Sequence, residues 1–144
     1  MTDVVNLVHD FFAVYNAHDL DALARYYAQN AVSVSPGGQG ESRDEILSYH
    51  VQFWEAFPDV HNTTLQAIAQ DDDVAVTALI TGTHTGPFLL PGGTVVSPTG
   101  RRVHLRCCWI FTLEAGLIVT HLLYWDQLEA YAQLGFLPQQ LNVT

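Results

Sequence analysis

Residues 101–126, RRVHLRCCWIFTLEAGLIVTHLLYWD, decide the fold of this chain. Long apolar runs lie on both sides of Glu114-Ala115-Gly116, and this pattern predicts two strands joined by a tight turn. Residues 61–72 and 73–84 alternate between apolar and polar side chains and meet at an acidic turn, so they predict a second strand pair. Residues 86–100 are rich in proline and glycine, and we expect a loop that folds over an opening.

The first third of the chain is predicted to be mainly helical. Residues 3–16 carry apolar side chains at helical spacing. Asp19 can cap a second helix. Its expected apolar stripe is Leu20, Leu23, Tyr26 and Tyr27. Residues 32–40 predict a short strand that ends in a Pro-Gly turn.

Two more helices complete the pattern. Residues 42–57 open with Ser42 and Glu45, the spacing of a capping box, and Pro58 ends the helix. Residues 127–137 predict a closing helix that ends at Gly135 and Pro138. Helices followed by a meandering sheet predict one α+β domain over residues 1–144, a cone with an apolar interior and one open end.

The composition narrows the range of functions. Five basic residues against fifteen acidic ones give a net charge of -10, which argues against binding to nucleic acid or anionic membranes. Only 14% of the residues are charged and 49% are hydrophobic, so we expect spare apolar surface in a pocket or a subunit interface. The N-terminal residues have no basic region and no long apolar run, so we expect no signal peptide. The adjacent Cys107 and Cys108 are expected to be reduced thiols of a cytoplasmic protein. The seven histidines are scattered, so we expect no metal site.

A strand-pairing register assumed for the last hairpin predicts where the Asp126 carboxylate lies. If Leu113 pairs with Leu117, then Arg106 faces Tyr124 and His104 faces Asp126. These four polar side chains would converge at one end of an apolar surface, where a partly desolvated carboxylate could remove a proton and return it. The opposite face would carry apolar side chains suited to a homo-oligomer, a dimer or tetramer. Those side chains are Trp109, Leu123 and Trp125, together with His121 as a packed or interface histidine. The other interpretation of Asp126 is a cap for the helix that follows it.

Four stretches together resemble one family. They are FPDVHNTTLQAIAQDDDVAV, TGTHTGPF, PTGRRVHLR and YWDQLEAYAQLGFLP. The combination strongly resembles the SnoaL-like polyketide (ester) cyclases, which have the nuclear-transport-factor-2-like cone fold, and the likeness runs from about Val5 to Pro138. The resemblance implies aldol ring closure on a hydrophobic, polycyclic ketone or ester, without metal or organic cofactor. It places the acid/base aspartate at Asp126.

The remaining site residues are assigned more loosely. His104 is expected to orient or tune Asp126, and Arg106 to neutralise it or to bind a substrate oxygen. The predicted substrate contacts are Tyr15, His50, Phe53, Tyr124, Trp109 and His84, the last in a lid. Two alternatives stay open: another reaction in the same pocket (epoxide hydrolysis, hydroxylation or isomerisation), or a non-catalytic module that binds a hydrophobic ligand.

Overall fold

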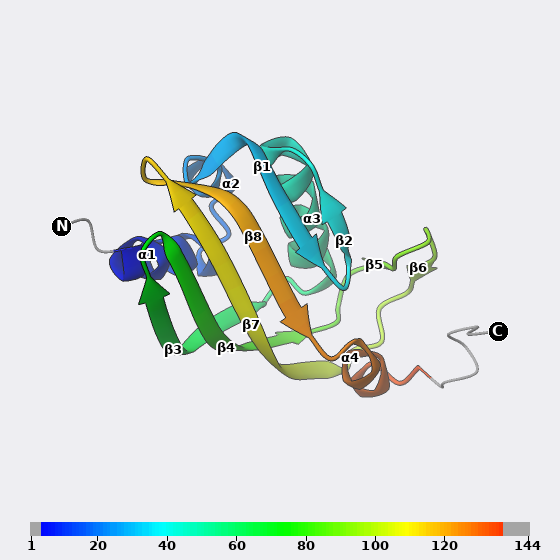
Figure 1. Ribbon diagram of the computed structural model, residues 1–144. Helices are drawn as coiled ribbons and strands as arrows, with labels where there is room; N and C mark the ends of the chain where they lie inside the picture. Colours follow the sequence, from blue (N-terminus) through cyan, green and yellow to red (C-terminus); the bar gives the residue numbers. More distant parts are fainter. Residues whose placement is uncertain (1–3, 137–144) are drawn as a thin grey trace.

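A six-stranded sheet curls around three helices. The computed structural model describes residues 4–136. The sheet order is β2-β1-β8-β7-β4-β3, and every neighbouring pair is antiparallel except β1 and β8 (Figure 1). The strands of this sheet are β1 (Tyr27–Ser35), β2 (Gly38–Gly40), β3 (His61–Gln70), β4 (Asp73–Thr83), β7 (Arg102–Glu114) and β8 (Leu117–Trp125). The α+β cone that the sequence predicts is confirmed.

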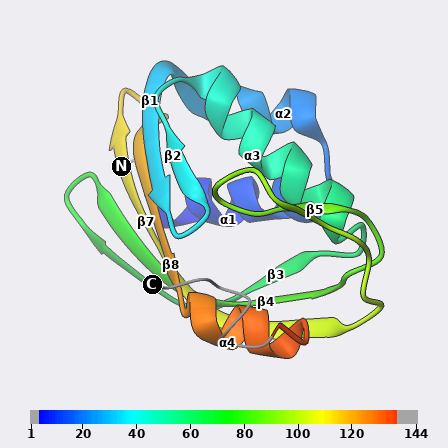
Figure 2. The ribbon, with the colours of Figure 1, turned by 90° about the vertical axis from the view of Figure 1, so that its right-hand side faces the viewer.

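The helices leave one end of the cone open. They are α1 (Val4–Asn16), α2 (Leu20–Ala24), α3 (Arg43–Ala56) and α4 (Gln127–Gln133). Figure 2 shows α1, α2 and α3 on the concave side of the sheet, while α4 lies at the end of β8. The predicted loop contains a short hairpin of β5 (Phe88–Leu89) and β6 (Val95–Val96), and β5 contacts α3 beside the opening. No helix among residues 4–136 has the length and apolar character needed to cross a membrane.

The caps that the sequence predicts are present. The Asp19 carboxylate accepts a hydrogen bond from the Ala22 amide, and the Ser42 hydroxyl accepts one from the Glu45 amide. The predicted length of the second helix is wrong, because α2 ends at Ala24 and Tyr27 begins β1. The closing helix is confirmed at its start, but residue 3 and Pro138, the predicted outer limits of two helices, lie outside the described residues.

The last hairpin forms with a register shifted by two residues. The turn is two residues long, Ala115 and Gly116, both with positive φ, so Glu114 pairs with Leu117. A bulge then follows, and beyond it Thr112 pairs with Thr120. The shorter turn and the bulge each move the register by one residue. Their sum of two keeps the side chains beyond the bulge on their predicted faces, whereas Leu117 and Ile118, between the turn and the bulge, exchange faces.

The face that lines the interior is the opposite of the predicted one. Along β7 the odd-numbered side chains from Val103 to Leu113 are buried, and the even-numbered ones are exposed or half-buried. The odd face meets the helices because it carries the bulky apolar side chains, with Trp109 only 1% exposed. Trp109, Leu123 and Trp125 therefore point inward, so the argument that they form an oligomer interface is wrong. The oligomeric state stays a prediction.

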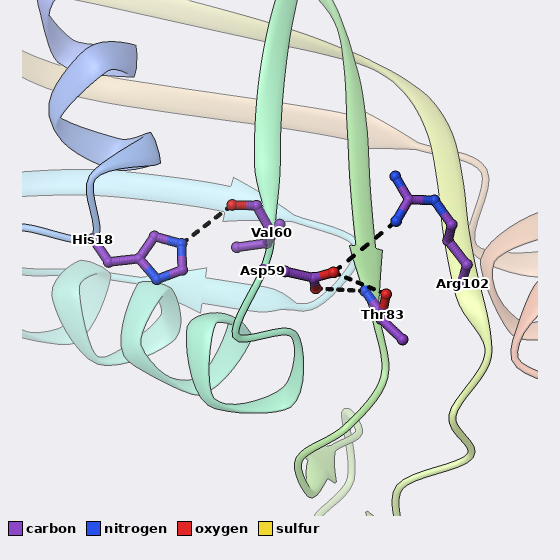
Figure 3. Close-up of polar contacts among 5 residues, drawn as sticks. All are labelled: His18, Asp59, Val60, Thr83 and Arg102. Atoms are coloured by element: carbon purple, nitrogen blue, oxygen red, sulfur yellow. Dashed lines mark hydrogen bonds and ion pairs between the residues drawn. The ribbon is translucent and has the colours of Figure 1, made fainter.

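The FPD stretch builds a corner rather than a site. The Asp59 carboxylate accepts hydrogen bonds from the Thr83 amide at 2.6 Å and the Thr83 hydroxyl at 2.8 Å, and it lies 4.0 Å from the Arg102 guanidinium (Figure 3). The backbone hydrogen bond from Thr83 is the main cause that lowers the pKa of Asp59. Beside it, the His18 ring bonds the Val60 carbonyl. These contacts tie the start of β3 to the end of β4, where the loop over the opening begins.

Helix α4 extends the sheet where β8 stops. Because β8 ends opposite Cys107, the backbone of His104 has no strand partner on that side. The Gln133 side chain takes the place of that strand: its carbonyl accepts from the His104 amide at 2.7 Å and its NH₂ donates to the His104 carbonyl at 3.1 Å. This pairing fixes α4 against the outer end of the sheet.

Candidate active site

A cavity of about 90 Å³ lies between α3, the concave face of the sheet and the β5 segment. Most of its wall is aromatic or aliphatic. These lining residues are Tyr15, Ile46, Tyr49, Phe53, Ile80, Phe88, Leu89, Pro91, Trp109, Leu123 and Trp125. The polar side chains in the wall are Ser33, Ser35, His50, Gln52, His121 and Gln127.

The described part of the cavity wall carries no charged side chain, because Asp, Glu, Lys and Arg are all missing from it. An ionised ligand entering this cavity would lose its hydration shell without gaining a counter-ion, which costs several kcal/mol, on the order of the penalty for an unpaired buried charge. The wall therefore favours a neutral, hydrophobic ligand.

Three buried side chains form a hydrogen-bonded chain at the wall, and two of them, His50 and His121, line the cavity. The Tyr27 hydroxyl lies 2.9 Å from His50 Nε2 and 2.9 Å from His121 Nδ1. Tyr27 comes from β1, His50 from α3 and His121 from β8, and the three are 1%, 7% and 4% exposed. The imidazole centroids of His50 and His121 are 5.7 Å apart. The fold thus brings two imidazoles to one phenol hydroxyl, and both imidazoles line the cavity.

Burial sets the charge of these groups. Desolvation lowers the pKa of His50 to about 4, and desolvation together with the nearby His50 lowers the pKa of His121 well below its ordinary value. Both rings are therefore neutral at pH 7, and each offers a lone pair. Burial also raises the pKa of Tyr15 well above its ordinary value, so this phenol remains a hydrogen-bond donor. Burial raises the pKa of the Cys107 thiol to about 12, which makes it a poor nucleophile.

Trp109 is held in place by the end of α1. Its indole N–H donates to Asn62 Oδ1 at 3.0 Å, and the Asn62 backbone in turn exchanges two hydrogen bonds with the Asn16 side chain. Edge-to-face contacts with Phe12 and Tyr15 complete the packing around the indole. The indole therefore forms a rigid wall of the cavity beside the imidazoles of His50 and His121.

The SnoaL-like domain family matches residues 8–121. This chain belongs to the SnoaL-like family. Among solved structures, AclR of Streptomyces galilaeus, a proposed hydroxylase, is 27% identical, with 96% of this chain and 84% of AclR covered and a TM-score of 0.80. IdmH of Streptomyces antibioticus, a proposed polyketide cyclase, is 26% identical, with 93% of this chain and 99% of IdmH covered and a TM-score of 0.76.

A third SnoaL-like structure supports the fold alone. It is a proposed SnoaL-like polyketide cyclase from Jannaschia sp. CCS1, 23% identical, covering 94% of this chain and 93% of its own, with a TM-score of 0.82. No curated protein sequence gives a significant match to this chain.

The position of Asp126 differs from the one predicted for a SnoaL-like acid. Asp126 is solvent-exposed, does not line the cavity, and caps α4 by accepting a hydrogen bond from the Glu129 amide at 3.1 Å. Its placement in an apolar pocket is therefore wrong, and the second interpretation of this residue, a helix cap, is confirmed. The reason is parity: Asp126 directly follows β8 and continues the alternation of Leu122 and Tyr124, which beyond the bulge are less buried than His121 and Leu123.

The predicted partners of Asp126 also lie outside the cavity. His104, Arg106 and Tyr124 are exposed on the outer face of the sheet, with Tyr124 54% accessible. None of them lines the cavity, so the expectation that they converge on an interior site is wrong.

His84 lies behind the cavity wall rather than in a lid. It is fully buried, and its Nδ1 accepts hydrogen bonds from the Thr99 hydroxyl at 2.9 Å and the Thr99 amide at 3.2 Å. Its ring packs against Phe57 and Phe88, and of these only Phe88 reaches the cavity. His84 therefore anchors the base of the loop instead of contacting a ligand directly.

The four other predicted contacts do line the cavity: Tyr15, His50, Phe53 and Trp109. Tyr27, Ser33 and His121 were not predicted as site residues. The available signal for His121 was its position on the same face as Trp109, the bulkiest side chain of the hairpin. Tyr27 gave no such signal, because its spacing fits the stripe of the preceding helix.

Proposed function

We propose that this chain is a cofactor-free acid/base enzyme that acts on a neutral, hydrophobic ketone or ester. The single observation that carries the proposal is the buried chain of His50, Tyr27 and His121 in the wall of an uncharged cavity. Membership of the SnoaL-like family supports catalysis over passive binding. The likeness to IdmH, a proposed polyketide cyclase, favours ring closure as the reaction, and the family resemblance implies that this closure is an intramolecular aldol reaction.

His121 replaces Asp126 as the proposed base. Burial lowers the pKa of His121, so its neutral ring is a weaker base than an ordinary histidine, but weak bases such as carboxylates also remove protons next to activated carbonyls. So weak a base needs an acidified C–H bond, such as one between two carbonyl groups. The proton would pass from the substrate carbon to His121, and the resulting enolate carbon would attack a second carbonyl of the same molecule.

The negative charge of the enolate must be stabilised in part by the substrate itself. The cavity wall offers neutral donors, the hydroxyls of Tyr15 and Ser33, and no cation among its described residues. Hydrogen bonds from such preorganised donors stabilise developing charge in a site that excludes water. A conjugated substrate that spreads the charge over its own rings fits this wall best. Phe53 and Trp109 would pack against those rings.

The size of the cavity adds one requirement. Pockets for small molecules usually enclose roughly 300–1,000 Å³, whereas this cavity has about 90 Å³. A polycyclic ligand therefore requires the cavity to widen, and we infer that the β5 segment moves outward, since it contributes Phe88, Leu89 and Pro91 to the wall and pairs only with the two-residue β6 among the described strands.

Deuterium exchange tests the proton-removal step. The probe is ethyl 2-oxocyclopentanecarboxylate, a neutral β-keto ester, and the measurement is the loss of its acidic C–H signal in D₂O by NMR. We expect the wild type to accelerate exchange over buffer and His121→Gln to lose at least about 100-fold of that acceleration. His104→Gln, which removes an exposed histidine from the outer face, is the matched control and should exchange at the wild-type rate. Wild-type exchange in His121→Gln would remove this residue from the mechanism.

Hydroxylation is the second candidate, because AclR is a proposed hydroxylase and covers nearly the whole chain. Mass spectrometry of the product distinguishes the two reactions: ring closure by aldol addition leaves the molecular mass unchanged, whereas hydroxylation adds one oxygen atom.

A further inference from the structure

The hydrogen bonds of Tyr27 restrict the protonation of both histidines. A phenol has one proton, so the Tyr27 hydroxyl can donate to only one of its two ring partners. The other ring must donate its own N–H to the Tyr27 oxygen, or one of the buried contacts at 2.9 Å is not a hydrogen bond. An unsatisfied buried polar group costs about 1–3 kcal/mol, so the arrangement with both contacts satisfied prevails.

Two arrangements satisfy both contacts when the rings are neutral. In the first, His121 donates from Nδ1 to Tyr27 and Tyr27 donates to His50 Nε2, which leaves both rings protonated at Nδ1. In the second, Tyr27 donates to His121 Nδ1 and His50 donates from Nε2, which leaves both rings protonated at Nε2. The two histidines therefore always carry the same tautomer, and they change tautomer together.

The remaining nitrogens, His50 Nδ1 and His121 Nε2, are then always unlike each other. Within residues 4–136 neither of these nitrogens has a protein hydrogen-bond partner, and both side chains line the cavity. In the first arrangement His121 Nε2 is a free base and His50 Nδ1 carries a proton. In the second the roles are exchanged. One end of the chain is thus an acid whenever the other end is a base.

We propose that His50 and His121, linked by Tyr27, form a switchable acid/base pair. One ring delivers a proton to one substrate atom while the other ring removes a proton from another substrate atom. This proposal rests on the proposed function, since it assigns the acid as well as the base of that reaction. Tyr27 is a positioning residue, because it acts on the substrate only through the two rings.

The proton transfers balance without net charge. The substrate C–H gives its proton to His121 Nε2, His121 Nδ1–H passes one to the Tyr27 oxygen, and Tyr27 O–H passes one to His50 Nε2. His50 Nδ1–H then gives a proton to the substrate oxygen, which becomes a hydroxyl. The chain is left in its second arrangement with both rings neutral. Exchange of the two end nitrogens with water in the empty cavity restores the first arrangement.

The surroundings of His50 and His121 favour the neutral form of both rings. No carboxylate within the described residues bonds either ring, and the third member is a phenol whose pKa burial raises well above its ordinary value. A charged imidazolium in this place would be desolvated and unpaired. Transfer along the chain avoids that species, because each ring receives one proton as it releases another.

Nitrogen NMR of the protein without any ligand tests the tautomer rule. Long-range ¹H–¹⁵N spectra at pH 7 distinguish a protonated ring nitrogen from one with a lone pair. We expect His50 and His121 to show the same tautomer, or matched averaging between the two, in the wild type and in Tyr26→Phe, the adjacent tyrosine that serves as control. Opposite tautomers, or an imidazolium in either ring, would overturn the proposal, and this wild-type result decides even if a variant fails to fold.

A second measurement separates this proposal from the proposed function. Tyr27→Phe removes the hydroxyl and keeps both histidines, so we expect its ring tautomers to become independent and its deuterium exchange on the β-keto ester to fall at least about tenfold. Tyr26→Phe should retain the wild-type exchange rate. Wild-type exchange in a folded Tyr27→Phe would refute the relay and leave His121 as a simple base. No exchange by the wild type, with matched tautomers, would instead refute the proposed function.

Discussion

Acidification from pH 7 to pH 5 should destabilise this protein through His50. The ring is neutral in the folded state because burial lowers its pKa from 6.5 to about 4, whereas the unfolded chain binds a proton below pH 6.5. The stabilisation is therefore complete above pH 6.5 and is lost progressively as the pH falls toward 4. His121 acts in the same direction, since its pKa is also lowered by burial.

The magnitude follows from the shift. Each pKa unit corresponds to about 1.4 kcal/mol. Between pH 7 and pH 5 the unfolded ring is protonated over the 1.5 units from 6.5 to 5 while the folded ring stays neutral. His50 alone should therefore reduce the free energy of unfolding by about 2 kcal/mol over this range. That is a large fraction of the stability of an ordinary domain.

Urea denaturation followed by circular dichroism at pH 7 and pH 5 measures the loss. We expect His50→Gln to lose about 2 kcal/mol less than the wild type between the two pH values. Ile46→Val, a buried change on the same helix, is the control: it should be less stable by about 1 kcal/mol at both pH values and keep the wild-type pH dependence. Equal losses in wild type and His50→Gln would show that this ring is not held neutral by burial.

Two further substitutions test the assignment of structural roles. Asp126→Ala removes the cap of α4, so it should cost about 1 kcal/mol in denaturation while deuterium exchange is retained; a folded Asp126→Ala without exchange would restore the catalytic role that the family resemblance implies. Gly86→Ala would place a methyl group against the Glu55 carbonyl of α3, a backbone atom that cannot rotate away, and should cost about 2–3 kcal/mol. An unchanged melting temperature for Gly86→Ala would show that the base of the loop is not tightly packed.

Local signals in the sequence predict the helices well and the site only in part. Asp19 and Ser42 mark helix starts because a capping side chain acts on amides two or three residues away. The end of α2 was misjudged because Tyr27 fits a helical stripe as well as the start of a strand. Only its pairing with β8 decides between them, and the spacing of residues 20–27 contains nothing about that strand.

In the last hairpin, local sequence patterns predict some features of the structure and not others. Alternation separates the two faces correctly except at Leu117 and Ile118, because the predicted register had a longer turn and no bulge. Which face turns inward depends on where the helices pack, and the apolar bulk of Trp109 and Trp125 indicates the answer more reliably than the position of an acid. No pattern in the sequence predicts that His50 and His121 bind the same Tyr27 hydroxyl, since α3 and β8 are brought together by the curl of the whole sheet.

A ribosome finishes β1 long before it makes β8, the parallel partner of that strand. Pairings between distant segments form slowly, because the intervening chain must lose its freedom first. Until residues 117–125 emerge, β1 has only the three-residue β2 beside it, and its other edge is open to a neighbouring nascent chain. Tyr27 and His121 therefore meet only at the end of synthesis, and a chain released early has an aggregation-prone edge at the place where the finished protein has the buried hydrogen bond between these two residues.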